Sequence, residues 1–332
     1  MKVSIKTNIF ITFLLLVGIV ALSLLFSQYY FSEKLAIEST NKTFRIISKN
    51  ISEHILNEAS DTRKVLSLKS KHKKLYAPIT FEPIHPFFDD MVLILQQNHH
   101  LHAIYFAHPD GSFYEVIHMQ GRTALYQTFK APPSTCWTIV TIINNQQQNA
   151  FLDKNFNLIT KNSFSKTYAV SERPWYSNAM KTTEIISTLP YFFSNSQKMG
   201  ITYAKKISPE GIVLALDYTM HQLNELLALQ EFDVNSEVFV VDKKGNKFAS
   251  SLFSKEGAQQ KAQTIHQELK QAFANKKTNQ VIKYQEEGKN YFALFTPLLA
   301  KDRFLGIKLD SETLLKPYRE SIRYAFLIAF IL

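Results

Sequence analysis

The chain has 332 residues, a length that fits two domains of modest size. Hydrophobic residues make up 45% and charged residues 20%, a balance that excludes wholesale disorder and can supply packed cores. The net charge is +10, but the lysines are scattered in short pairs, which favours a solvated basic surface over a face for nucleic acid or anionic lipid. The single cysteine, Cys136, excludes an intramolecular disulfide framework and a multi-cysteine metal site.

An uncharged apolar run at residues 9–26 predicts a transmembrane helix. Its eighteen positions approach the roughly 20 residues that cross a bilayer. Lys2 and Lys6 precede the run, so the positive-inside rule places residues 1–8 in the cytoplasm and residues 9–27 in the membrane. A cleaved signal peptide is the alternative. We favour an uncleaved anchor because the run is longer than the apolar core of a signal peptide and a helical pattern continues past it.

Residues 28–75 are predicted to form a long stalk helix. Apolar residues recur at spacings of three and four, and no proline or glycine interrupts residues 28–69. The recurring positions are Phe44, Ile47, Ile51, Ile55 and Ala59. This stripe is wide enough to pack on a sheet domain and on a partner helix, so we expect a homodimer through the stalk.

A first block of strands follows Pro78, Pro83 and Pro86, which end the helical pattern. Residues 102–107 and 112–118, joined by a Pro-Asp-Gly turn at 109–111, predict a hairpin. Residues 137–143, 200–207 and 211–217 predict further strands, and the polar residues 145–149 predict a loop between strands.

A second block starts near Phe232. It contains predicted strands at residues 237–242, 247–250, 280–284, 290–297 and 303–309, and a helix at residues 258–276. The two blocks share the same order of elements, and both close on an apolar run with a terminal acid, Asp217 or Asp310. The sequence therefore predicts an α+β chain with two similar modules in tandem, built on antiparallel sheets.

The C-terminal residues 311–332 predict a closing helix and the start of a second transmembrane helix. Lys316, Arg319 and Arg323 precede the apolar residues 324–332, which are too few to span a bilayer. We expect the protein to continue into the cytoplasm, although a buried or amphipathic terminal helix is the alternative. Two spans would place residues of about 30 to 320 outside the cytoplasmic membrane.

One group of side chains is suited to binding a zwitterion. Arg173 can pair bidentately with a carboxylate, while Trp175 and Tyr176 provide rigid walls with polar groups. Asp217 ends a strand that looks buried, where a ligand ammonium would satisfy its charge. Tyr168 and Tyr191 can complete the cage through cation–π contacts and hydroxyl hydrogen bonds.

These residues resemble the double Cache sensor domains of bacterial chemoreceptors, histidine kinases and cyclic-dinucleotide enzymes. The resemblance covers about residues 30 to 320 and rests on the long helix, the tandem modules, the Arg-Pro-Trp-Tyr-x-x-Ala motif from Arg173 to Ala179, and Pro190-Tyr191. It implies PAS-like modules, a membrane-distal one at residues 76–225 and a membrane-proximal one at residues 226–310.

More specifically, the chain is similar to the amino-acid-binding subgroup of this family. That likeness implies that Arg173, Trp175 and Tyr176 hold a ligand carboxylate, that Tyr168 and Asp217 hold its amine, and that Tyr191 is a further pocket residue. Phe192 and Phe193 follow Tyr191 where the family has x-Asp, and the usual Thr-Gly is missing, which leaves the ligand side chain open. The motif also occurs in members of the family that bind other ligands, and Arg173 could instead pair with Glu172 or Asp217.

The predicted function is that of an extracytoplasmic sensory region, anchored in the inner membrane, that signals to a cytoplasmic output domain. The alternative is the sensor region of a histidine kinase or a cyclic-di-GMP enzyme, an HD-GYP phosphodiesterase or a diguanylate cyclase, that senses a different small molecule. A purely structural or protein-binding ectodomain is a third class. We expect no catalytic set, cofactor or nucleic-acid partner in this region, since it has neither a Gly-x-Ser-x-Gly elbow nor a glycine-rich phosphate loop. The histidines between His99 and His118 lack the spacing of a metal motif.

Overall fold

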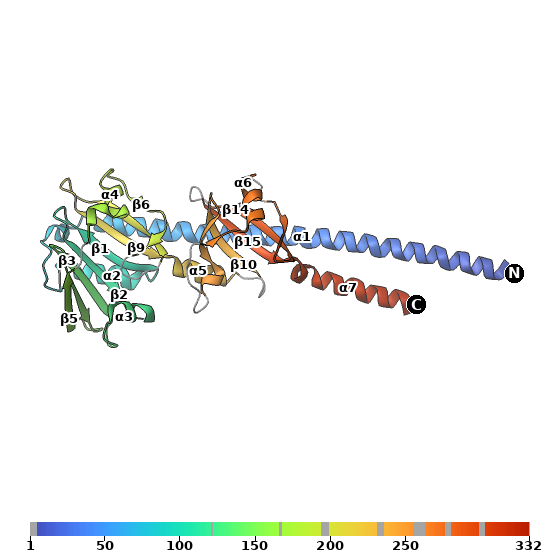
Figure 1. Cartoon of the computed structure of the whole chain (residues 1–332), viewed down its shortest axis with the longest axis horizontal. Coiled ribbons are helices and arrows are strands. Elements are labelled where there is room, and N and C mark those ends of the chain that lie inside the picture. Colours follow the sequence, from blue (N-terminus) through green and yellow to red (C-terminus); the bar gives the residue numbers. More distant parts are fainter. Residues whose placement is uncertain are drawn as a thin grey trace. The chain divides into compact units, whose positions relative to one another are not determined.

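The computed structural model describes residues 5–120, 122–165, 168–193, 199–230, 236–254, 263–275, 280–298 and 303–331 (Figure 1). The chain divides into two compact units. We call Glu53–Leu226 the first module, and we call Met1–Ser52, Leu227–Leu252 and Ala262–Leu332 together the second module. Phe253 and Ser254 group with the first module.

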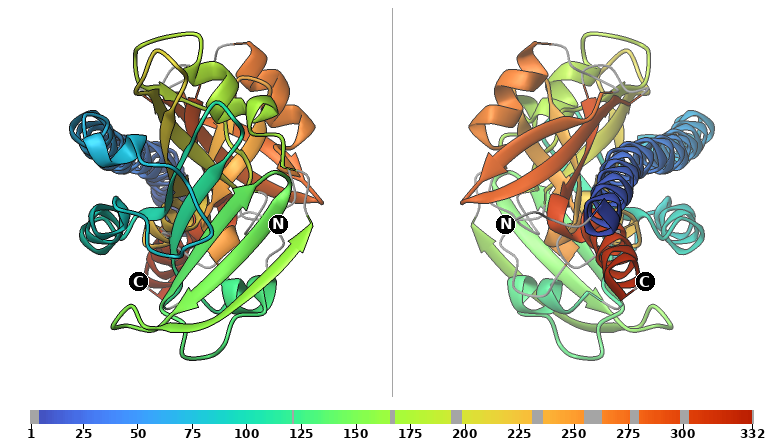
Figure 2. Two further views of the ribbon diagram at one scale, coloured as in Figure 1. Left: turned by 90° about the vertical axis from the view of Figure 1, so that its left-hand side faces the viewer. Right: turned by 90° about the vertical axis from the view of Figure 1, so that its right-hand side faces the viewer.

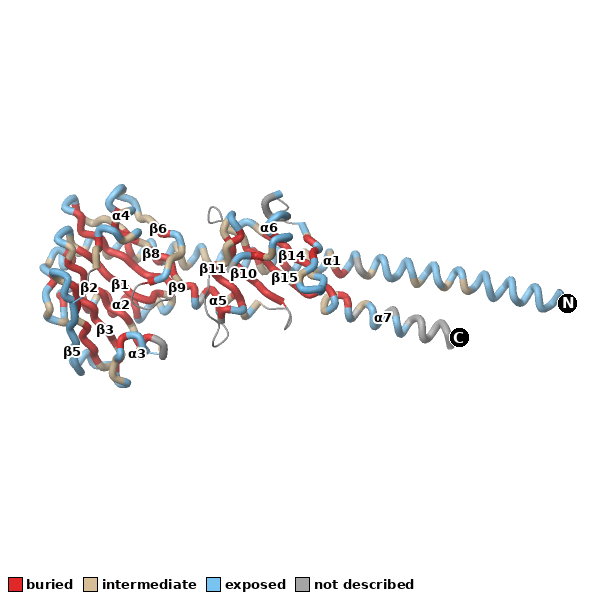
Figure 3. Tube along the Cα trace, viewed as in Figure 1, coloured by how far each residue is buried: buried red, intermediate tan, exposed pale blue. Residues whose placement is uncertain are grey.

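A single helix, α1 (Ile5–Lys69), contains both the predicted membrane segment and most of the predicted stalk. It is 65 residues long, and its N-terminal part is exposed along its length (Figure 3). Within the described residues, α1 is the one helix that is long and apolar enough to cross a membrane. The predicted apolar run and the stalk therefore form one uninterrupted helix. Its pairing with a second copy of the chain stays a prediction.

The first module is built on an antiparallel sheet with helices on both faces. Its strands are β1 (Leu101–Ala107), β2 (Phe113–His118), β3 (Trp137–Ile143), β4 (Gln146–Leu152), β5 (Leu158–Ser165), β6 (Ile186–Ser187), β7 (Tyr191–Phe192), β8 (Met199–Lys206) and β9 (Val213–Thr219). Its helices are η1 (Lys73–Tyr76), α2 (Phe88–Gln97), α3 (Thr123–Phe129), η2 (Val170–Glu172) and α4 (Pro174–Ala179), and α5 (Met220–Ala228) leads toward the second module.

The described strands of this sheet run in the order β5-β4-β3-β2-β1-β9-β8-β6, with β7 also paired to β8. Alternate residues point to opposite faces, so each central strand contributes to two cores. On one face, Ile104 and Phe106 pack with α2 and with Leu66 of α1. On the other, Ala103 and Tyr105 pack with α4 (Figure 2). Ala103, Tyr105 and Ala107 therefore face α4, as does the candidate site, whereas an irregularity between Leu101 and Ala103 leaves Leu101 in the opposite core.

The hairpin of β1 and β2 confirms the prediction from the Pro-Asp-Gly turn. The two strands pair antiparallel from Ala103↔Ile117 to Ala107↔Phe113. Gly111 adopts a φ of 84°, a conformation open to glycine at little cost. The Asp110 side chain accepts hydrogen bonds from the backbone and hydroxyl of Ser112 at 2.9 and 2.6 Å, which closes the turn.

The predicted loop at residues 145–149 is wrong. β4 begins at Gln146, and the turn is confined to Asn144 and Asn145, both with positive φ (50° and 59°). Asparagine tolerates this conformation, and two such residues form the tight turns that suit hairpins. Gln147 and Asn149 are buried, and the Gln147 side-chain amide donates to Asn149 Oδ1 at 2.7 Å, whereas Gln147 Oε1 has no hydrogen-bond partner. β5 was not predicted, because every residue of it is exposed and it carries no apolar alternation.

The second module repeats the arrangement on a smaller scale. Its strands are β10 (Glu237–Asp242), β11 (Asn246–Ser250), β12 (Gln263–Thr264), β13 (Ile282–Glu286), β14 (Lys289–Pro297) and β15 (Arg303–Asp310), and its helices are η3 (Ser251–Ser254), α6 (Gln267–Ala274) and α7 (Ser311–Ile331). η3 crosses the unit boundary. The described strands run β12-β11-β10-β15-β14-β13. Here β10 lies between β11 and β15 as β1 lies between β2 and β9, which confirms the α+β fold with tandem modules.

The helix predicted at residues 258–276 is shorter in the described chain. Residues 263–264 form β12, which pairs with β11, and α6 begins only at Gln267. Residues 258–262 and 276 lie outside the described residues. Ile265 and Leu269, two of the apolar positions behind the prediction, are buried in the core of this module.

Helix α7 packs beside α1 within the second module. Leu315 of α7 lies in a cluster with Ala36 of α1 and Phe292 of β14, and the partly buried Tyr318 extends that contact. The helix is continuous through Ile331, so the predicted closing helix and the apolar tail are one element. That this tail enters the membrane stays a prediction.

We predict that Gly306 of β15 is required for the packing of the second sheet. A Cβ there would clash with the ring of Phe239, the residue that Gly306 faces on β10. Gly306→Ala should lower the free energy of unfolding by about 1–3 kcal/mol through overpacking. Circular dichroism would follow both modules, whereas Trp137 and Trp175 report by fluorescence on the first module alone.

The matched test is the double variant Phe239→Leu with Gly306→Ala. Because leucine removes the ring atoms that crowd the new Cβ, the two losses should not add. Strict additivity, or a shift confined to the tryptophan signal, would contradict this account.

Candidate ligand-binding site

Five of the six predicted site residues line one small cavity in the first module. They come from three parts of the fold: the segment before and within α4, the short strand β7, and the end of β9. These residues are Tyr168, Arg173, Trp175, Tyr191 and Asp217. The structure thus brings together side chains spread over 50 positions of the chain.

Asp217 lies at the base of this cavity and is only 5% exposed. Its Oδ1 accepts hydrogen bonds from the Tyr105 hydroxyl at 2.7 Å and the Thr202 hydroxyl at 2.6 Å. Thr202 is its partner across β8 and β9. Since Thr202 has one hydroxyl proton and donates it to Asp217, the Tyr191 hydroxyl, 2.6 Å away, must donate to Thr202. The result is a chain of hydroxyls that converges on one carboxyl oxygen.

Burial raises the pKa of Asp217 to about 7, against the opposing effects of the Thr202 and Tyr105 hydrogen bonds and the Arg173 charge. The pKa of Tyr105 is also raised, first by burial and then by the nearby Asp217. Because this carboxyl group is shielded from water, a neighbouring cation would strongly stabilise its ionised form. The site is therefore electrostatically suited to a ligand ammonium group.

Arg173 supplies the opposite charge. It precedes α4, where Pro174 at the first helical position fixes the start of the helix. Its guanidinium carbon lies 5.3 Å from the centre of the Tyr168 ring, within cation–π range. Its Nε is buried without a hydrogen-bond partner, and Arg173 makes no ion pair with Glu172 or any other described residue. An unpaired buried donor on a cation favours an anionic ligand group.

Aromatic rings form the walls between these two charges. Trp175 is 1% exposed and packs edge-on against Tyr105, with ring centres 4.9 Å apart. Phe113 packs against both Tyr168 and Trp175, at 5.2 and 6.3 Å. Rigid rings of this kind exclude water and hold the polar groups in fixed positions.

Tyr176 lies away from the cavity in this conformation. Its hydroxyl donates to the carbonyl oxygen of Gly211 at 2.7 Å. Neighbouring residues of a helix point about 100° apart, and in this conformation Trp175 lines the cavity whereas Tyr176 does not. A ligand contact by Tyr176 stays a prediction, and the hydrogen bond gives it a role in holding the turn before β9.

Sequence reasoning missed half of the cavity. The additional lining residues are His102, Tyr105, Phe113, Glu115 and Phe193, and Thr202 completes the hydrogen bonds. Glu115 is a second buried acid, opposite Tyr105 in the β1–β2 ladder. The one available signal was the alternation of the hairpin, which places Tyr105, Phe113 and Glu115 on a common face.

Arg122 fixes His102 at the cavity wall. It donates to His102 Nδ1 at 3.0 Å and to the carbonyl oxygens of His102 and Leu101 at 2.9 Å each. Because a guanidinium only donates, Nδ1 must accept, and the neutral ring then carries its proton on Nε2. Phe193 stacks on the other side, with ring centres 5.9 Å apart and planes 10° from parallel.

The cavity measures about 20 Å³ in this structure, which is room for about one water molecule. An amino acid is several times larger, so a ligand must widen the site. β7 is the lining element with the fewest backbone pairs, since it joins β8 only through Tyr191↔Gly200 and Phe192↔Met199. The wall made by Tyr191 and Phe193 is therefore the easiest to displace.

The histidines of the first module do not meet at a common point. His108 hydrogen-bonds to the carbonyl oxygen of Leu75, His118 stacks on Trp137, and His102 lies in the cavity. In the part of the chain that the structure describes, no three His, Cys, Asp or Glu side chains form a group that could hold a metal ion.

We predict that Asp217→Asn stabilises the protein at neutral pH. Because the pKa of Asp217 is raised, the folded state holds its proton between about pH 4 and pH 7 while the unfolded state has lost it. The wild type therefore loses stability as pH rises through this window, by up to about 1.4 kcal/mol per pH unit. Thermal unfolding from pH 4 to 8 should show that the stability of the variant rises relative to that of the wild type up to about pH 7.

Asp153→Asn is the matched control. The Asn157 side chain and the backbone N–H groups of Asn155 and Asn157 lower the pKa of Asp153, so its stabilising effect is already complete above about pH 4. Its difference from the wild type should stay constant across the same range. A constant difference for Asp217→Asn as well would contradict the raised pKa.

Comparison with solved structures relates the whole arrangement to chemoreceptor domains. The ligand-binding domain of the Campylobacter jejuni chemoreceptor Tlp3, in complex with 4-methylisoleucine, matches with a TM-score of 0.55 at 17% identity, over 85% of this chain and 95% of that domain. The ligand-binding domain of Mlp24 with asparagine matches with a TM-score of 0.51 at 15% identity, over 87% of this chain and 98% of that one. No protein-family model and no curated protein sequence matches the chain. At these identities the likeness is one of fold, and the chain has the double Cache fold of chemoreceptor ligand-binding domains.

Proposed function

We propose that the first module binds a small zwitterion, an amino acid or a related amine, and that the chain is the sensory region of a transmembrane receptor. The observation that carries the proposal is that Arg173 and Asp217, which have no ion-pair partner among the described residues, line the same aromatic cavity. The Arg173 Nε is buried without a partner, and the Asp217 carboxyl is buried with a pKa of about 7. A ligand carboxylate at Arg173 and an ammonium at Asp217 would satisfy both.

The ligands of the structural neighbours support this chemistry. The Tlp3 domain was solved with 4-methylisoleucine, L-norvaline and isoleucine, and the Mlp24 domain with asparagine. Each of these carries one carboxylate and one ammonium on the same carbon. In this chain the residues with matching chemistry are Arg173 and Asp217, with Tyr168, Trp175, Tyr176 and Tyr191 as further predicted contacts.

The small volume of the cavity supports the receptor role. A ligand that needs a wider cavity binds preferentially to a conformation in which the wall at Tyr191 and Phe193 has moved. Such a ligand shifts the population toward that conformation by its difference in affinity for the two states. We propose that residues 9–27 anchor the chain, that the modules lie outside the cytoplasmic membrane, and that α1 and α7 convey the bound state to the cytoplasmic side.

We predict that Arg173→Gln weakens binding of the cognate amino acid at least about 30-fold, since the carboxylate loses a charged partner in a buried site. The ligand is first found by calorimetric screening of the common amino acids. Arg303→Gln is the matched control: Arg303 also lies over an aromatic ring, 5.4 Å from the centre of Phe248, but it belongs to the second module and does not line the cavity. Its affinity should equal that of the wild type. Failure of every amino acid to bind, or normal binding by Arg173→Gln, would exclude the proposal.

We also predict that binding weakens below neutral pH and releases a proton. Asp217 must be ionised to pair with an ammonium, so affinity should fall about tenfold per pH unit below the pKa of about 7 and level off above it. Calorimetry in buffers of different ionisation enthalpy would measure the proton released. A flat profile between pH 5.5 and 8 would show that the ammonium does not pair with Asp217.

A further inference from the structure

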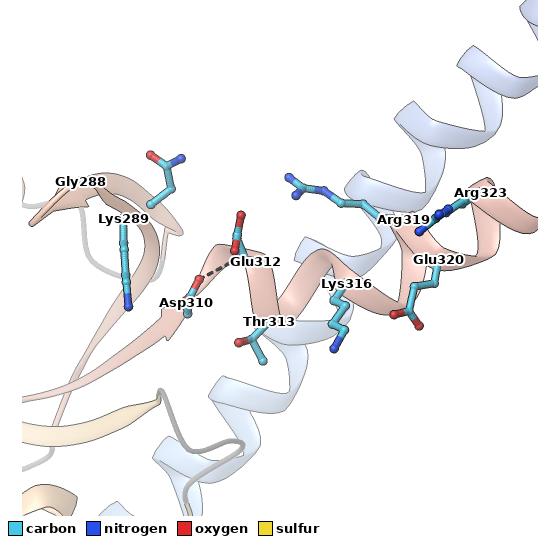
Figure 4. A pocket seen from close by; sticks show the side chains of 10 residues that line it. Gly288, Lys289, Asp310, Glu312, Thr313, Lys316, Arg319, Glu320 and Arg323 are labelled. Carbon is cyan, nitrogen blue, oxygen red and sulfur yellow. Dashed lines mark hydrogen bonds between the residues drawn. The ribbon is translucent and has the colours of Figure 1, made fainter.

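A large open hollow lies in the second module, between the turn that joins β13 to β14 and helix α7. It has a volume of about 610 Å³, far larger than the cavity of the first module. Its cations are Lys289, Lys316, Arg319 and Arg323, and its acids are Asp310, Glu312 and Glu320. Figure 4 shows Lys316, Arg319 and Arg323 following one another along α7.

The charges are unevenly distributed along this hollow. Asp310 and Glu312 lie at the start of α7, where the Asp310 side chain accepts the backbone N–H of Glu312 at 2.8 Å. Farther along the helix, the hollow is lined by three cations and by a single acid, Glu320. The three cations are spaced by three and four residues, which places them on one side of the helix. In the described part of the chain, none of the three makes an ion pair, so their charges are available to an external anion.

The position of these cations relative to the apolar run of α1 follows from helix geometry. Leu315 of α7 packs with Ala36 of α1, and the two helices run antiparallel side by side (Figures 1 and 2). At about 1.5 Å per residue, Arg323 lies roughly 12 Å from Leu315, level with Gln28 of α1. Gln28 is two residues past the end of the apolar run. Arg319 is level with Ser32, one turn farther from that run.

Aromatic side chains gather at the same level. Tyr29, Tyr30 and Phe31 of α1 are 41%, 61% and 64% exposed, and Tyr324 of α7 is 66% exposed. Exposed tyrosines beside an apolar helix are typical of the boundary between hydrocarbon and headgroups. The basic residues therefore lie where lipid phosphates would be.

We propose that this hollow binds the phosphate-bearing headgroup of an anionic phospholipid, in the leaflet that faces the modules. Arg319 and Arg323 contact the phosphate, because a guanidinium binds phosphate oxygens through two parallel N–H groups. Lys316 adds a point charge at the rim. The bound headgroup would hold α7 at a fixed height relative to α1, which makes lipid composition an input to this helix pair. None of the residues that line the cavity of the first module lines this hollow.

The test is native mass spectrometry of the full chain, released from micelles that contain equal amounts of phosphatidylglycerol and phosphatidylcholine with matched acyl chains. A surface-bound charge contributes roughly fivefold per basic residue to the affinity for anionic lipid. We expect at least about that preference for phosphatidylglycerol in the wild type, and its loss in the triple variant Lys316→Gln, Arg319→Gln, Arg323→Gln.

The matched control removes three exposed lysines of the first module, Lys71→Gln, Lys154→Gln and Lys181→Gln, and should keep the preference. Raising the salt concentration should reduce the preference of the wild type, a result that needs no variant to fold. An equal preference in the wild type and in the α7 triple variant would overturn the proposal. So would displacement of the lipid by millimolar inorganic phosphate, which would identify a site for free anions. We expect every one of these variants to keep the wild-type affinity for the amino acid, which would show that the two sites are separate.

Discussion

The candidate site depends on the burial of one carboxyl group, that of Asp217. Moving a carboxylate out of water is costly unless hydrogen bonds and a cation compensate for the lost hydration. The Tyr105 and Thr202 hydroxyls supply the hydrogen bonds, but Arg173 is not in ion-pair contact, and the pKa of Asp217 stays near 7. In the first module, the negative charge of Asp217 is therefore only partly compensated within the aromatic cavity. The ammonium of the proposed ligand would complete the compensation of this charge, which would link the stability of the free protein to ligand binding.

The second module contains a buried acid whose charge is compensated by the protein itself. Glu237 of β10 is also buried, but both of its carboxylate oxygens accept hydrogen bonds from Lys247, at 2.8 and 3.0 Å. The Ser250 hydroxyl adds a third bond at 2.7 Å. A buried acid with its own lysine requires no ligand. Two modules with the same order of central strands thus differ in whether the buried acid has its own cation, and this argues for ligand binding at Asp217 and for a structural role of Glu237.

Most strands and the charged ends of the site could be predicted because their signals are local. The residues from Tyr168 to Trp175 lie within one short segment, and the β1–β2 hairpin has its own turn. Tyr105 and Thr202 could not be predicted as partners of Asp217, because only the register of β1, β9 and β8 brings them together. The strand at Gln146 was taken for a loop because its buried polar residues pair with each other and leave no apolar alternation. Tyr176 was assigned by motif; in this structure its hydroxyl bonds to the carbonyl oxygen of Gly211 and it does not line the cavity, so its contact with a ligand stays a prediction.

The same strand that carries Asp217 also contacts the long helix. Tyr218, the next residue of β9, points to the opposite face, where its hydroxyl donates to Glu58 of α1 at 2.6 Å. Five residues farther along α1, Arg63 donates to the carbonyl oxygen of Ile185 at 3.2 Å and lies over the ring of Tyr203 of β8. On the cavity side, β9 therefore contributes Asp217 to the lining and β8 supports it through the Thr202 hydroxyl, while both strands contact α1 on the other face. Because α1 has no proline and no break between this contact and its apolar run, a displacement of β9 or β8 on binding has a continuous helix through which to act.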